Sequence, residues 1–288
     1  MSQYALVAIA ASIGSGCGEK SPTTATPAPL SARSLDNVRY GTDAAQVMDI
    51  RLPAGRSAST AVVVFIHGGG WDGGDKGIFT ATDLNTFLAR GFACVNINYR
   101  LASTPLNIHD PMLSNDVTAA LDFVAQQAAG YVVSGSTFGL VGHSAGAHLA
   151  LLAAYKYDPQ RRIKAVASLS GPTDFNAADF LAVPGILGIL ERYLGVTKAA
   201  QPARWTGASP IAQATATSPP TILLQGRLDG LVPFSQAASM HARLVSLNVP
   251  DDYRLFATYD HDLSYAAIGR FPDDVWGPTL AWFTKYVK

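Results

Sequence analysis

Hydrophobic residues fall in short uninterrupted runs, separated by longer segments in which apolar positions recur with helical spacing. An uninterrupted apolar run of five or six residues is typical of a strand buried on both faces. The segments 36–40 and 46–52 instead alternate apolar and polar residues, as antiparallel strands with one solvated face do. We expect strands at 36–40, 46–52, 61–66, 93–99, 138–141, 165–169, 221–225 and 253–257, and helices at 82–90, 112–128, 235–247 and 273–288. Strands alternating with helices predict an α/β protein with a mostly parallel central sheet flanked by helices.

The segment 172–220 breaks this alternation. It contains an apolar stretch, 180–190, interrupted by Pro184, Gly185 and Gly188. Two interpretations fit: a small cap insertion that lends an apolar wall to a pocket, or an irregular helical insertion packed on the sheet edge. The apolar stretch favours the cap.

The N-terminal region differs in composition from the rest. Residues 4–13 are apolar but too short to span a bilayer, and 21–29 is a Pro/Thr/Ala tract that favours an extended tether over a core. We therefore expect a leader at 1–17, a disordered tether at 18–34 and one folded domain at 35–288. The small residues before Cys17 make the leader resemble a bacterial lipoprotein signal. That resemblance implies export and membrane anchoring through a lipidated Cys17. A cytoplasmic protein with a disordered leader is the alternative.

Composition excludes several classes of partner. Acidic and basic residues balance at 21 each, so no bulk charge favours nucleic acid. The only cysteines are Cys17 and Cys94, too few for a disulfide framework, and Cys94 lies in a predicted buried strand. No His/Cys cluster has metal-ligand spacing, so we expect neither a metal nor a cofactor.

Ser144 is the strongest candidate for chemistry. It stands at the centre of a Gly-x-Ser-x-Gly pentapeptide, 142–146, directly after a predicted strand and directly before a helix-forming stretch. Such a strand–turn–helix places the serine at the tip of a tight turn, exposed and close to a helix N-terminus. A serine hydroxyl is a poor nucleophile until a base takes its proton, so the motif predicts partners elsewhere in the chain.

The base and the acid should follow other strands, because side chains at the carboxyl ends of parallel strands meet at one edge of the sheet. Among six histidines, His261 lies in the loop just past the strand 253–257 and is the predicted base. Asp229 follows the strand 221–225 and is the predicted carboxylate that orients the imidazole. The competing acids, Asp174, Asp251 and Asp252, are better explained as turn or capping residues.

A glycine loop completes the candidate site. The sequence His-Gly-Gly-Gly-Trp at 67–71 follows the buried strand 61–66, on the same edge as Ser144. Glycines let backbone N–H groups approach a substrate oxygen, so Gly69, Gly70 and Ala145 are the predicted oxyanion-hole donors.

Together the motifs at 67–71, 98–101 and 142–146, with Asp229 and His261, resemble the α/β-hydrolase superfamily. They are most similar to esterases and lipases with a His-Gly-Gly-Gly loop. This group includes hormone-sensitive-lipase-like and feruloyl/acetylxylan-type carboxylesterases. The Gly-Gly-Asp-Lys at 73–76 favours the second type and also resembles arylformamidases. Ser103, Thr104 and Pro105 replace the Pro-Glu that continues the lipase-like pattern.

The resemblance implies a serine carboxylic ester hydrolase that forms an acyl-enzyme on a small-molecule or polysaccharide-linked ester, with short acyl or aryl groups expected. Two alternatives remain: an amide hydrolase of the arylformamidase type, and a non-catalytic binding module with the same fold.

Overall fold

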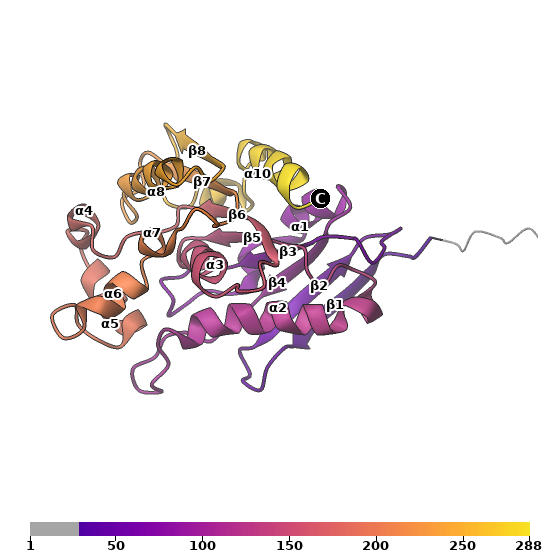
Figure 1. The fold of residues 1–288 in the computed structure, drawn as a ribbon, viewed down its shortest axis with the longest axis horizontal. Coiled ribbons are helices and arrows are strands. Elements are labelled where there is room, and N and C mark those ends of the chain that lie inside the picture. Colours follow the sequence, from indigo (N-terminus) through magenta and orange to yellow (C-terminus); the bar gives the residue numbers. More distant parts are fainter. Residues whose placement is uncertain (1–28) are drawn as a thin grey trace, which may run out of the picture.

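The computed structural model describes residues 29–288, and its centre is one eight-stranded sheet (Figure 1). The strand order is β1-β2-β4-β3-β5-β6-β7-β8, with β1 and β2 antiparallel to their neighbours and the other strands parallel. The strands are β1 (Arg33–Arg39), β2 (Val47–Leu52), β3 (Val62–Ile66), β4 (Ala93–Ile97), β5 (Phe138–His143), β6 (Ile163–Leu169), β7 (Thr221–Gly226) and β8 (Asp251–Phe256). The predicted mostly parallel α/β architecture is therefore confirmed.

The N-terminal boundary differs slightly from the prediction. Strand β1 begins at Arg33, two residues before the expected start of the domain, and pairs with β2 through Arg33 and Leu52. The end of the predicted tether is thus part of the sheet. The predicted leader 1–17, Cys17 and residues 18–28 of the tether lie outside the described residues.

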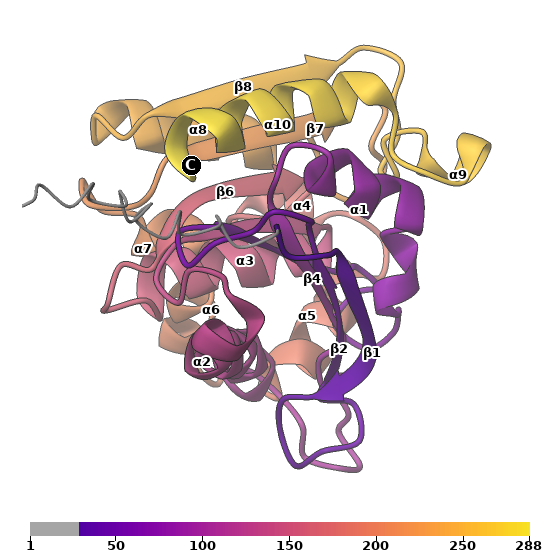
Figure 2. The same cartoon turned by 90° about the vertical axis from the view of Figure 1, so that its right-hand side faces the viewer.

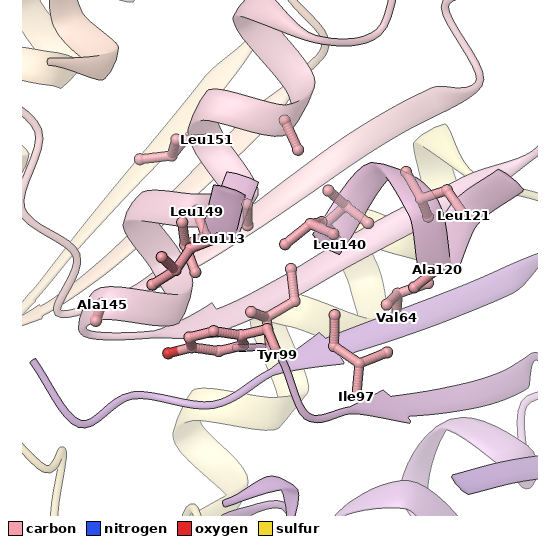
Figure 3. Close-up of a cluster of buried hydrophobic side chains, with 14 of the residues drawn as sticks. Val64, Ile97, Tyr99, Leu113, Ala120, Leu121, Leu140, Ala145, Leu149 and Leu151 are labelled. Atoms are coloured by element: carbon pink, nitrogen blue, oxygen red, sulfur yellow. The ribbon is translucent and has the colours of Figure 1, made fainter. Parts of the chain in front are cut away.

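Helices cover both faces of the sheet, as alternating side chains along the buried strands require. Val62, Val64 and Ile66 of β3 pack with α2 and α3, whereas Val63 and Phe65 pack with α1 and α10. Figure 3 shows side chains of α2 and α3 meeting those of β3, β4 and β5. These helices are α1 (Ala81–Leu88), α2 (Met112–Tyr131), α3 (Ala145–Lys156) and α10 (Asp273–Tyr286), with α8 (Ser235–Ser246) against β7 and β8.

The segment 172–220 forms four short helices that gather beyond one end of the sheet (Figures 1 and 2). They are α4 (Ala178–Leu181), α5 (Ile186–Leu194), α6 (Pro202–Gly207) and α7 (Pro210–Gln213). Phe180, Leu190 and Trp205 are buried in the same core as α2 and α3. The insertion is therefore packed onto the domain. Within 29–288, no helix is long and apolar enough to cross a membrane.

Candidate active site

Ser144 occupies a sharp turn between β5 and α3. Its backbone has φ 53° and ψ −120°, a conformation that residues other than glycine rarely adopt. A Cβ at Gly142 would lie 2.3 Å from the carbonyl oxygen of Gly146, and one at Gly146 would lie 2.1 Å from that of Ile66. Both glycines of the pentapeptide are therefore required by close backbone approach, which turns the serine out of the sheet.

The structure brings the three predicted reacting residues together. The Oγ of Ser144 lies 2.8 Å from Nε2 of His261, and Nδ1 of His261 lies 2.8 Å from Oδ2 of Asp229. Since a carboxylate oxygen only accepts, Nδ1 carries the proton and Nε2 presents a lone pair to the serine hydroxyl. This is the geometry of an activated nucleophile.

Asp229 is held by four donors, and its side chain is fully buried. Oδ2 accepts from His261 and from Nε2 of Gln225 at 2.7 Å, while Oδ1 accepts from the backbone N–H groups of Leu231 and Val232 at 2.9 and 2.8 Å. The carboxylate therefore has a single orientation. The role of Gln225 was not predicted, although a glutamine at the end of an apolar strand indicates a buried hydrogen-bond partner.

The competing acids have other partners. Asp251 pairs with His241, Asp252 pairs with Arg254, and Asp174 accepts from the backbone N–H of Asn176. Asp174 is therefore a turn residue, as predicted, whereas the prediction was wrong for Asp251 and Asp252, which begin β8 and form ion pairs.

The glycine loop lies beside Ser144, since a Cβ at Gly68 would be 3.1 Å from the serine Cβ. Within residues 29–288, the N–H groups of Gly69 and Gly70 have no hydrogen-bond acceptor. Ala145 begins α3, so its N–H also lacks a partner within the helix. Three unsatisfied donors close to the nucleophile fit an oxyanion hole, and the assignment of Gly69, Gly70 and Ala145 stays a prediction.

The Asn-Tyr-Arg segment after β4 supports this loop. The hydroxyl of Tyr99 donates to the carbonyl of His67 at 3.0 Å, and the two rings stack at 4.3 Å. Asn98 binds the segment that follows the loop, accepting from the N–H of Lys76 and donating to the carboxylate of Asp75. Arg100 pairs with the buried carboxylate of Asp116. The segment 98–100 therefore stabilises the position of the glycine loop.

Trp71 connects the loop to the insertion. Its indole N–H donates to Nδ1 of His148 at 3.2 Å, and Nε2–H of His148 donates to the carbonyl of Ala208 at 2.8 Å. Burial lowers the pKa of His148 to about 4, so the ring is neutral. Trp71 also stacks on Tyr193 of α5. Two buried hydrogen bonds thus connect the glycine loop, through Trp71 and His148, to Ala208 of the insertion.

A pocket of about 460 Å³ opens over Ser144 and His261. The insertion contributes Ile189, and Arg192 on the same helix pairs with Asp72, which directly follows the glycine loop. The insertion therefore supplies one apolar residue of the pocket wall, while its large buried side chains pack onto the core. Ile189 belongs to the apolar stretch predicted to form a pocket wall, and Asp75 to the motif at 73–76. Lining residues that the sequence did not indicate are Asp72, Ile78, His143, Leu231 and Asp262.

Cys94 is buried in β4, as predicted, and burial raises the pKa of its thiol. In the described part of the chain, no three His, Cys, Asp or Glu side chains are grouped as metal ligands.

The sheet, its flanking helices and the turn that carries Ser144 define an α/β-hydrolase fold. More specifically, the chain belongs to the BD-FAE family, an α/β-hydrolase esterase family whose model matches residues 48–244.

Known proteins agree with this assignment. The chain is 32% identical over 237 residues to the probable carboxylic ester hydrolase LipM of Mycobacterium tuberculosis, covering 75% of this chain and 54% of LipM. It is 30% identical over 151 residues to kynurenine formamidase of Danio rerio, covering 49% of this chain and 47% of that protein. The chain spans about half the length of the curated relatives it matches. A truncated carbohydrate esterase from gut microbiota superposes with a TM-score of 0.74 at 20% identity, covering 88% of this chain and 95% of that one, which supports the fold.

Proposed function

We propose that this protein is a serine carboxylic ester hydrolase that acts on small-molecule or polysaccharide-linked esters with short acyl or aryl groups. The observation that carries the proposal is the continuous hydrogen-bonded series from Asp229 through His261 to Ser144, with both links at 2.8 Å. Membership of an esterase family and the relatives named as ester hydrolases support the same activity.

In this proposal Ser144 Oγ attacks the ester carbonyl while Nε2 of His261 takes its proton. The imidazolium that forms is stabilised by Asp229, whose orientation is set by its other donors. The N–H groups of Gly69, Gly70 and Ala145 receive the negative charge of the tetrahedral intermediate. His261 then gives the proton to the leaving alcohol, and water releases the acyl group from Ser144 by the same steps.

An amide hydrolase of the arylformamidase type is a second candidate. It is favoured by the match to kynurenine formamidases, which covers up to about half of this chain. The same three residues serve ester and amide cleavage, so substrate profiling separates the two. A non-catalytic binding module is disfavoured because all three residues are present and within hydrogen-bond distance.

The test combines covalent labelling with substrate profiling. A fluorophosphonate should form one adduct on the wild-type protein, located at Ser144 by peptide mass spectrometry. A panel of p-nitrophenyl esters from acetyl to palmitoyl, with acetylxylan, a feruloyl ester and an aryl formamide, then measures kcat/KM. Absence of an adduct would favour the binding module, and a higher kcat/KM for the formamide than for every ester would favour the amidase.

A further inference from the structure

His143, the residue before the nucleophile, is buried beside the site without a part in the chemistry described above. Its side chain is only 4% exposed and lies at the carboxyl end of β5. Its Nε2 lies 3.1 Å from the backbone carbonyl oxygen of His261, 118 residues further along the chain. Because a carbonyl oxygen only accepts, Nε2 carries the proton and donates.

The opposite edge of the His143 ring contacts the glycine loop. A Cβ at Gly68 would lie 2.9 Å from Nδ1, and Nδ1 has no hydrogen-bond partner in the described residues. The ring is therefore wedged between the loop of His261 and the loop that carries the predicted oxyanion donors. Burial lowers the pKa of His143 to about 4, and the nearby His261 is the second cause of this shift. The ring therefore stays neutral when His261 becomes an imidazolium.

The loop that carries His261 is attached to the domain on both sides of this residue, through the hydrogen bond from Tyr259 to Asp274 and the buried side chain of Leu263. The N–H of Leu228 donates to the carbonyl of Tyr259 at 2.9 Å, and the N–H of Leu263 donates to that of Asp260 at 3.3 Å. In the range 29–288, His143 is the one donor to the carbonyl of His261 itself. Movement of that carbonyl would carry the imidazole away from both Ser144 and Asp229.

We propose that His143 is a positioning residue for the proposed hydrolase. Its Nε2–H···O=C bond to His261 fixes the base relative to the backbone of the nucleophile, because His143 and Ser144 are consecutive residues. The inference rests on the proposed function and adds a residue that acts through the backbone of His261. This role needs the N–H donor of the imidazole, which an apolar side chain of similar size lacks.

The test compares His143→Leu, which removes the donor, with His143→Gln, whose Nε2 amide can donate at a similar reach. For p-nitrophenyl butyrate, kcat of His143→Leu should fall about 10- to 100-fold with KM within about twofold, since misplacing a catalytic group affects the transition state. The rate of fluorophosphonate labelling at Ser144 should fall in parallel. His143→Gln should recover most of both rates.

A matched control separates positioning from loosened packing. Phe271 contacts the His143 ring at 5.5 Å between centroids, so Phe271→Leu disturbs the same cluster and leaves the bond to His261 in place. It should lower the midpoint of thermal unfolding while kcat stays within about threefold of the wild type. Circular dichroism confirms that each variant is folded.

The outcomes separate this inference from the proposed function. If His143→Leu is folded and keeps wild-type kcat and labelling rate, or if the glutamine variant is as slow as the leucine variant, His143 is not a positioning residue. Failure of the wild-type protein to bind the fluorophosphonate would instead overturn the proposed function. If labelling succeeds but no ester is cleaved, the labelling rates of the variants still test the role of His143.

Discussion

The Oγ of Ser144 lies 2.8 Å from Nε2 of His261, although 117 residues separate them in the chain. Ser144→Ala removes the nucleophile, so kcat for ester hydrolysis should fall by roughly a million-fold, the loss found when the serine of such a triad is removed. The measurement is kcat for p-nitrophenyl butyrate. Ser170→Ala is a matched control, because Ser170 is also a buried serine with positive φ after a strand, and it should keep wild-type activity. Full activity in Ser144→Ala would refute the assignment.

Asp229→Asn should lower kcat by about 10,000-fold with little change in KM, because an amide N–H facing His261 favours the wrong tautomer. Gln225→Met removes one donor to Oδ2 of Asp229 and should cause a smaller loss, about 10-fold. Asp174→Asn tests the competing carboxylate and should have no effect. The kcat values of the two aspartate variants rank the two acids directly, and a large loss in Asp174→Asn would reassign the role.

Two glycine-to-alanine substitutions should have opposite effects on stability. At Gly146 a Cβ would meet the carbonyl oxygen of Ile66 at 2.1 Å, so Gly146→Ala should destabilise the fold by several kcal/mol, at least about 3. At Gly188, in α5, a Cβ would meet nothing within 4 Å, so Gly188→Ala should stabilise by about 0.5–1 kcal/mol. Urea denaturation measures both. An equal change in the free energy of unfolding for both variants would contradict the close approach of α3 to β3 at Gly146.

Ile189 should influence the acyl length that the pocket accepts. It lines the pocket, and a Cβ at Gly70 would lie 3.7 Å from its Cγ2. Ile189→Ala shortens a side chain of the apolar wall and so enlarges the pocket, which should raise the octanoyl-to-acetyl ratio of kcat/KM by about 10-fold, the effect of one or two methylene contacts. Leu187→Ala, at an exposed position of the same helix, should leave the ratio unchanged. An unchanged ratio in both variants would show that the acyl group does not contact Ile189.

Stability should fall with acid, because burial lowers the pKa of both His143 and His148 from 6.5 to about 4. Below pH 6.5 the unfolded chain binds protons that the folded chain excludes, so protonation favours unfolding until the pH reaches about 4. Each histidine should reduce the free energy of unfolding by about 2 kcal/mol between pH 7.5 and pH 5.

Urea denaturation at pH 7.5, 6 and 5 measures this dependence. His148→Gln should remove the contribution of His148, so its stability should decline less steeply with acid than that of the wild type. Parallel curves for the two proteins would show that His148 is not buried as a neutral ring.

The sequence by itself determined the α/β architecture and the order of the reacting residues along the chain. Short apolar runs between turn residues are typical of buried strands, and the two glycines around Ser144 allow the tight turn from strand to helix. Asp229 and His261 each follow such a strand, and parallel strands bring their carboxyl ends to one edge. These inferences depend on local periodicity and on a general property of parallel sheets.

Only the tertiary structure decided how the site is held. The roles of Gln225, His143 and Ile189 depend on loop conformations and on contacts between segments far apart in the chain. No periodic pattern marks such contacts. The insertion likewise could not be placed from its sequence, because proline and glycine interrupt its helices, and long-range packing onto the core decided where each short helix lies.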